Sequence, residues 1–78
     1  MSPETAARKL IEIAKSVNTT QDGRVYIPEI TGPFLSEHNG TVEQYGAGLR
    51  IAIDRGWLDL HESGKFVRLT KAGANSFT

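Results

Sequence analysis

Residues 57–70 read WLDLHESGKFVRLT, and this segment gives the clearest indication of the fold. Two runs of alternating polar and apolar residues, 57–61 and 66–70, flank a short loop that contains Gly64. Alternation with a period of two around such a loop is typical of a β-hairpin. Pairing His61 with Phe66 places Leu58, Leu60, Val67 and Leu69 on one face, and Trp57, Asp59, His61, Phe66, Arg68 and Thr70 on the other. Asp59 then lies opposite Arg68, a pair worth about 0.2–1 kcal/mol.

The segment before the hairpin predicts a helix over residues 42–55 that ends at Gly56. Thr41 and Gln44 have the spacing of a capping box, in which each side chain bonds the backbone of the other residue. The side of this helix expected to face the core carries Val42, Tyr45, Leu49, Ala52 and Ile53. The side expected to face away carries Glu43, Gln44, Ala47, Arg50, Ile51 and Asp54.

Two glycines, Gly46 and Gly48, lie inside this helix and cost about 1 kcal/mol each relative to alanine. Close approach of another helix explains them better than contact with a ligand backbone. Arg50 has two open interpretations, which are an ion pair with Asp54 one turn later and a contact with nucleic acid.

The N-terminal part predicts a helix over residues 3–17, with Ser2 as its cap and Pro3 at its first position. Its apolar stripe is Ala6, Leu10, Ile13, Ala14 and Val17, with Ile11 on the flank. A polar run over residues 18–23 follows, with a turn at Asp22 and Gly23.

Residues 24–27 are rich in β-branched and aromatic side chains and predict a short edge strand that Pro28 stops, with Tyr26 packing on the core. A short helix is expected to begin at Pro33 and to close at Gly40. A helix from Pro28 is less favoured because it would have to cross Gly32-Pro33. Thr70 to Asn75 predicts a last helical turn, with Phe77 folding back onto the body.

Length and composition limit the possible classes of protein. The chain has 78 residues, which is one domain over residues 1–78, with 9 basic and 9 acidic side chains and no cysteine. No apolar run is long enough for a membrane span and no signal-type block is present, so a cytoplasmic protein is expected. Neither a metal site nor a cofactor is indicated, and no nucleophile elbow or phosphate-binding loop occurs. We therefore expect a protein that is not an enzyme.

The order of helix, strand, two helices and hairpin resembles the winged-helix arrangement, a three-helix helix-turn-helix core with a hairpin wing. The resemblance is carried by Arg55-Gly56-Trp57-Leu58 and by residues 64–73, GKFVRLTKAG, which look like the corresponding end of MarR- and PadR-type DNA-binding domains. It extends in layout over nearly the whole chain and identifies a superfamily only.

This resemblance implies an α+β winged helix that binds double-stranded DNA in transcriptional regulation, with the third helix in the major groove and the wing on the backbone or minor groove. The implied helix contacts are Thr41, Glu43, Gln44, Ala47, Arg50, Ile51 and Asp54. The implied wing contacts are His61, Ser63, Gly64, Lys65 and Arg68. Gln44 and Arg50 are the residues able to read base edges.

The charge departs from this pattern, because DNA binding normally depends on a basic face and the net charge here is zero. Dimerisation, which doubles the contacts, would strengthen a weakly binding monomer. The alternative is a winged helix that contacts a protein partner or a second copy without nucleic acid. Its candidate contacts are Ile51, Trp57 and Phe66, provided that the two aromatic rings are not covered by the first helix or by Phe77. No small-molecule ligand is indicated.

Overall fold

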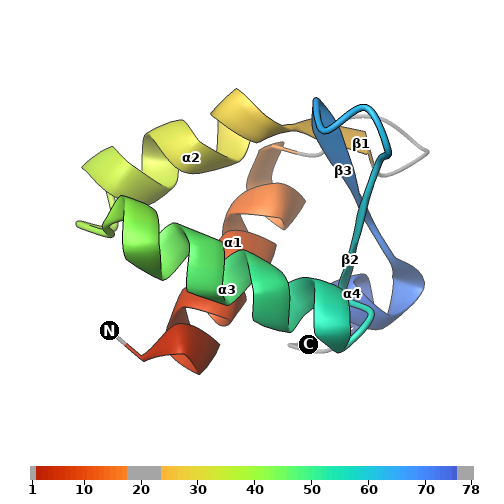
Figure 1. Cartoon of the computed structure of the whole chain (residues 1–78), viewed down its shortest axis with the longest axis horizontal. Coiled ribbons are helices and arrows are strands. Elements are labelled where there is room, and N and C mark those ends of the chain that lie inside the picture. The colour runs from red at the N-terminus through yellow and green to blue at the C-terminus, as the bar shows by residue number, and fades with distance from the viewer. Residues whose placement is uncertain (1, 18–23, 76–78) are drawn as a thin grey trace.

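The computed structural model describes residues 2–17 and 24–75. The elements in chain order are α1 (Pro3–Val17), β1 (Arg24–Tyr26), α2 (Ile27–Ser36), α3 (Val42–Asp54), β2 (Leu58–Leu60), β3 (Phe66–Leu69) and α4 (Lys71–Asn75). The strands form one antiparallel sheet in the order β1-β3-β2, so the fold is α+β and β1 lies at an edge as predicted. In Figure 1, α3 crosses in front of α1, with α2 above these two helices and the β2–β3 hairpin at the C-terminal end of α3. The predicted turn at residues 22–23 and Phe77 lie outside the described residues.

Helix α1 has the predicted bounds and cap, because the Ser2 Oγ accepts a hydrogen bond from the Thr5 N–H at 3.1 Å. Its buried residues are Ala6, Ala7, Leu10, Ile11, Ile13 and Ala14. The prediction of Ile11 at the flank was wrong, because α1 is central and contacts α2, α3, α4 and β3, which widens its buried face. This helix therefore supplies half of the buried apolar residues of the core.

The prediction for α2 was wrong, because the helix begins at Ile27 and passes through Gly32-Pro33. Pro28 suits the first turn, where a missing N–H costs nothing. Proline inside a helix normally also clashes with the Cβ of the residue before it, and Gly32 has no Cβ. The buried side chains of Ile30 and Phe34 hold the helix against the core in spite of the lost hydrogen bond at Pro33.

The prediction that Gly40 ends this helix as its C-terminal cap was also wrong. Asn39, with a φ of 54°, has the left-handed conformation that follows α2, and the Gly40 N–H donates to the Phe34 carbonyl at 3.0 Å. The Phe34 ring lies directly against the Gly40 Cα, where any Cβ would overlap it. Gly40 is therefore required by close packing on a buried ring.

Helix α3 begins with the predicted capping box: the Thr41 Oγ1 accepts from the Gln44 N–H at 3.1 Å, and the Gln44 Oε1 accepts from the Thr41 N–H at 3.0 Å. The side of the helix that faces the core differs from the prediction, since Val42 is 72% exposed while Gly48 and Ala52 are buried. A Cβ on Gly48 would lie 2.8 Å from the Ala6 Cβ, so this glycine lets α3 approach the α1 backbone. The interpretation of Gly48 as a close-packing residue is confirmed.

Gly46 does not fit that interpretation, because it is exposed and no atom lies within 4 Å of the place a Cβ would take. The two glycines of this helix therefore have different surroundings. Gly48 is explained by packing inside the domain, and Gly46 is not.

The hairpin has the predicted register, with Asp59 opposite Arg68 and Leu60 opposite Val67. Gly56, with a φ of 75°, ends α3 and turns the chain into β2. The Thr70 hydroxyl donates to the Gly56 and Trp57 carbonyls and accepts from the Gly73 N–H at 3.0 Å, which ties α4 to the start of the hairpin. Leu60 was expected in the core but is 43% exposed, because β2 is the other edge strand of the sheet.

Candidate nucleic-acid and protein interfaces

The face of the sheet turned away from the core carries two rows of side chains from three strands. One row pairs Arg24, Arg68 and Asp59 across β1, β3 and β2, and these residues occupy Cα-paired positions. The second row contains Tyr26 and Phe66, which are paired, and His61, whose N–H donates to the Phe66 carbonyl at 3.1 Å. Residues two apart on a strand share a face, so both rows lie on the same surface. We call these six residues the outer sheet face.

Phe66 lies at the centre of the aromatic row. The His61 ring stacks on it with centroids 4.4 Å apart, and Tyr26 meets it edge-on at 5.9 Å. The Arg24 guanidinium carbon lies 4.7 Å from the centroid of the same ring, within cation–π range. Tyr26 was expected to pack on the core but is 49% exposed, because its position on β1 turns it to the outer face.

The cationic row places two guanidinium-bearing residues on neighbouring strands. Like charges directly opposite each other in a sheet are unfavourable, and opposite charges are favourable. Asp59 occupies the position paired with Arg68 on its other side and adds a carboxylate to this row. Two arginines beside aromatic rings form a surface of the kind that holds a phosphate next to a stacked base.

The hairpin loop is closed by its own side chains. The His61 Nδ1 accepts from the Ser63 N–H at 3.1 Å, and the Ser63 Oγ accepts from the Lys65 N–H at 3.3 Å. Gly64 takes a φ of 73°, and its N–H donates to the His61 carbonyl at 2.9 Å. The His61 Nδ1 also lies 2.8 Å from the Ser63 Oγ, so this ring nitrogen is engaged within the loop. Lys65 and Arg68 are exposed beside this loop.

The predicted contact residues on α3 divide into three groups. Glu43, Arg50 and Asp54 are exposed, Ala47 is half-buried, and the side chains of Thr41 and Gln44 bond each other's backbone in the capping box. Within residues 2–17 and 24–75 the Arg50 side chain forms no ion pair, so the suggested pair with Asp54 is not made. Arg50 is thus a free cation between two exposed carboxylates.

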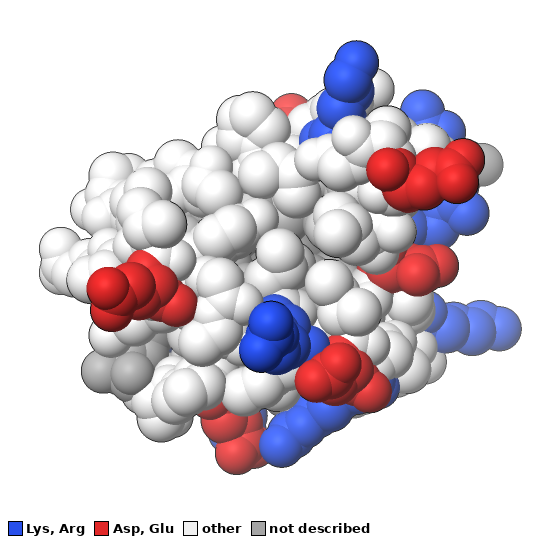
Figure 2. Space-filling view, in the orientation of Figure 1, with Lys and Arg blue, Asp and Glu red and all other residues white. Residues whose placement is uncertain are grey.

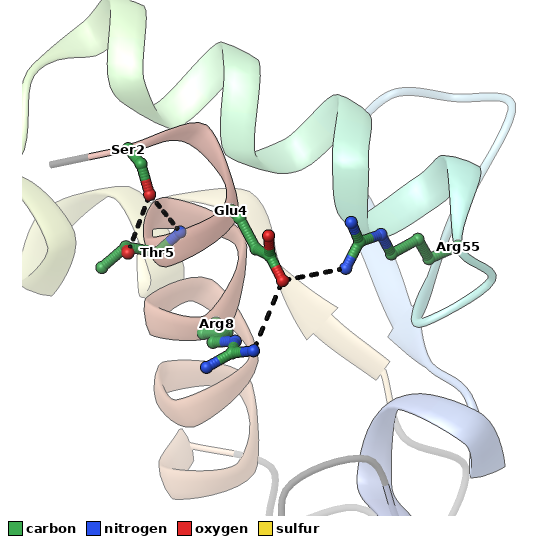
Figure 3. Close-up of polar contacts among 5 residues, drawn as sticks. All are labelled: Ser2, Glu4, Thr5, Arg8 and Arg55. Atoms are coloured by element: carbon green, nitrogen blue, oxygen red, sulfur yellow. Dashed lines mark hydrogen bonds and ion pairs between the residues drawn. The ribbon is translucent and has the colours of Figure 1, made fainter.

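The predicted partner contacts are less exposed than that hypothesis requires. Ile51 and Trp57 pack against the core, and Phe66 is half-buried under Arg24 and His61. The Arg55 guanidinium lies over the Trp57 ring at 5.2 Å. It also donates to the Glu4 carboxylate at 3.3 Å, and Glu4 accepts from Arg8 at the same distance (Figure 3). Arg55 therefore covers Trp57 and joins α3 to α1.

The exposed apolar side chains lie elsewhere. Leu35 on α2, Val42 on α3 and Leu60 on β2 are the exposed large aliphatic residues of the described chain. Figure 2 shows that the surface over α2 is largely uncharged, that single charged side chains are spaced along α3, and that charges gather at the hairpin end. This distribution separates a weakly charged helical surface from a charged hairpin.

The sequence did not identify Arg24, Tyr26, Val42 or Gly46 as site residues. For Arg24 and Tyr26 the missing information was the pairing of β1 with β3, which joins residues far apart in the chain. The exposure of Val42 and Gly46 depends on how α3 is turned against α1.

Comparisons with known proteins found no relative of this chain. No protein-family model, curated protein or solved structure matches the chain. No helix in the described ranges is both long and apolar enough to cross a membrane.

Proposed function

We propose that the chain is a winged-helix domain that binds double-stranded DNA through its hairpin and its outer sheet face. The order of the elements supports the winged-helix assignment, since a helix and a short strand precede two helices and a hairpin. The sheet order β1-β3-β2 also supports it, because the short strand then pairs with the second strand of the hairpin.

The observation that carries the DNA proposal is the pairing of Arg24 with Arg68 on the outer sheet face. Two guanidinium groups on neighbouring strands can contact one phosphate through charge-assisted hydrogen bonds, so this pair is suited to an anionic ligand. Lys65 and the Nε2 side of His61 extend the same surface into the hairpin loop. Duplex DNA presents phosphates at regular spacing along such a surface.

Helix α3 has a smaller part in this proposal than the resemblance implies. Thr41 and Gln44 serve the capping box, and the exposed carboxylates of Glu43 and Asp54 oppose phosphates. Arg50 is the one exposed cation of the helix. Contacts to DNA are therefore expected to be dominated by backbone phosphates and to show little base specificity.

The test is an amide NMR titration with a random-sequence duplex at about 50 and about 200 mM salt. We expect shifts at Tyr26, at residues 61–65 and at Arg68, and we expect them to fade at the higher salt. Arg68→Gln should weaken binding and lower the salt dependence by about one phosphate contact. Lys9→Gln, which removes a cation from α1, is the matched control and should change binding little. An unchanged spectrum at low salt would refute the proposal.

A second candidate function is contact with a protein through α3. The observation that favours it is the exposed apolar side chain of Val42 beside the open position at Gly46. An apolar contact weakens little with salt, whereas a phosphate contact weakens steeply, so salt dependence separates the two candidates.

A further inference from the structure

One line along the exposed side of α3 carries both apolar and charged residues that nothing in the described chain covers. We call this line the α3 stripe, and it consists of Val42, Glu43, Gly46, Arg50 and Asp54. Val42, in the first turn of the helix, is 72% exposed. Neither Glu43 nor Arg50 forms a side-chain ion pair within the described residues.

Gly46 lies near the middle of the stripe and leaves the helix backbone open to solvent. Two surface hollows of about 480 and 330 Å³ share Gly46 and Arg50 in their linings. Ala47 and Ile51 line the first, and Leu49 and Ile53 line the second. Pro3 also lines the first hollow and Asp54 the second, so each combines apolar side chains with the charge of Arg50. A helix surface with a glycine between two such hollows permits another helix to approach closely.

The charges of the stripe are arranged to complement themselves. Glu43 precedes Gly46 by about one helical turn, and Arg50 follows it by about one turn. When a second α3 is laid antiparallel with the two glycines at the crossing, Glu43 of each copy lies opposite Arg50 of the other. A two-fold axis makes both pairs at once, as an isologous contact requires.

We propose that α3 is a homodimer interface, in which the helices of two copies pack antiparallel across Gly46. The same two-fold arrangement brings Val42 of each copy toward the hollow lined by Leu49 and Ile53 of the other. The contact thus covers the exposed valine and pairs Glu43 with Arg50 twice across the two-fold axis. This inference rests on the second candidate function and names its partner, which is a second copy of this chain.

The proposed dimer leaves the outer sheet face uncovered, because that face belongs to β1, β2 and β3. The dimer would therefore carry two pairs of Arg24 and Arg68. A single helix pair buries less area than a standard stable interface, so the dimer is expected to be weak. Its formation should be visible only toward millimolar protein concentration.

The test is sedimentation equilibrium of the full chain from about 10 µM to about 1 mM at low salt. The wild type should associate to a dimer and no further. Glu43→Lys and Arg50→Glu should each weaken association about tenfold, because each places two like-charged pairs in the interface. The double variant, which exchanges the charges, should recover association to near the wild-type level. Glu12→Lys, with the same charge change on the exposed side of α1, is the matched control and should associate like the wild type.

A second variant tests the close approach itself. At Gly46 an added Cβ meets no atom within 4 Å in the monomer, so Gly46→Leu begins its side chain in open space, but the leucine would separate the two helices. We expect Gly46→Leu to be folded by circular dichroism and to be monomeric at all concentrations tested.

Two results would overturn the dimer: a wild type that is monomeric at 1 mM, or a folded double variant that associates no better than either single variant. Neither result touches the DNA proposal, because the duplex titration follows shifts at Tyr26, residues 61–65 and Arg68. Those shifts would still be expected in the monomeric Glu43→Lys variant.

Discussion

Arg24 and Arg68 occupy paired positions on neighbouring strands, so two cations face the same side of the sheet. Asp59 lies on the other side of Arg68 and is the nearest cross-strand compensation. Asp59, on the edge strand β2, is the carboxylate of this row of paired residues. Removing that carboxylate should affect stability and binding in opposite directions.

We predict that Asp59→Asn lowers the free energy of unfolding by about 0.2–1 kcal/mol at low salt. The loss should shrink at about 0.5 M salt, where surface charges are screened. The same variant should bind duplex DNA more tightly, because a negative charge leaves the outer sheet face. Glu62→Gln, in the hairpin loop without a cross-strand partner, is the control for the unfolding measurement. Equal losses in the two variants would argue against a specific effect of the arginine row.

The two glycines of α3 should respond in opposite directions to alanine. Gly46→Ala is expected to raise the free energy of unfolding by up to about 1 kcal/mol, because the added methyl group meets no atom and alanine favours a helix. Gly48→Ala should lower it by about 1–3 kcal/mol, because its Cβ would lie 2.8 Å from the Ala6 Cβ and from the Ala7 backbone nitrogen. Urea unfolding at a protein concentration of about 10 µM, where a weak dimer is absent, measures both. Effects of the same sign would show that the packing of α3 on α1 differs from that described.

The capping box makes a separate prediction about Thr41. Thr41→Ala should lower the free energy of unfolding by about 1 kcal/mol, because the Gln44 N–H loses its acceptor. Thr41→Ser retains the hydroxyl and should retain most of the stability. If Thr41→Ala instead leaves stability unchanged but weakens DNA binding, then Thr41 contacts the DNA. Its assignment as the helix cap of α3 would then be wrong.

Burial gives Tyr45 a distinct alkaline behaviour. Desolvation raises the pKa of its phenol above the usual 10.0, and its ring lies 6.2 Å from the ring of Phe34. The unfolded chain therefore loses this proton first as the pH rises, so stability is unaffected below the usual pKa and falls above it. The free energy of unfolding should be measured between about pH 9 and about pH 11.5, on either side of the tyrosine pKa. It should decline less steeply with pH in Tyr45→Phe than in the wild type. An equal decline in Tyr45→Phe and the wild type would argue against a buried phenol at this position.

The elements that the sequence predicted well are those specified by local chemistry. Ser2, Thr41 and Gly56 mark helix ends through caps and a left-handed turn, and the alternation of residues 57–70 fixes the hairpin register. Helix α2 was mispredicted because the effect of Pro33 depends on the residue before it. A glycine at position 32 removes the steric reason for stopping.

The candidate sites were harder to predict because they depend on contacts distant in sequence. The hairpin half of the outer sheet face follows from the register, but the half contributed by β1 follows only from its pairing with β3. The α3 stripe depends on the rotation of α3, which Gly48 determines through its contact with Ala6. Hydrophobic periodicity placed Val42 in the core because the method counts only apolar side chains. It therefore misses a buried helix face that has a glycine at its centre.

The seam between α1 and α3 also has a consequence for motion. Ala6, Ala7 and Gly48 meet there through methyl groups and backbone, without a side chain that has alternative rotamers. Close packing at this point resists sliding of the two helices past each other. Amides that face this seam should exchange with solvent only when the whole domain opens, so their slowest exchange rates would report the global free energy of unfolding.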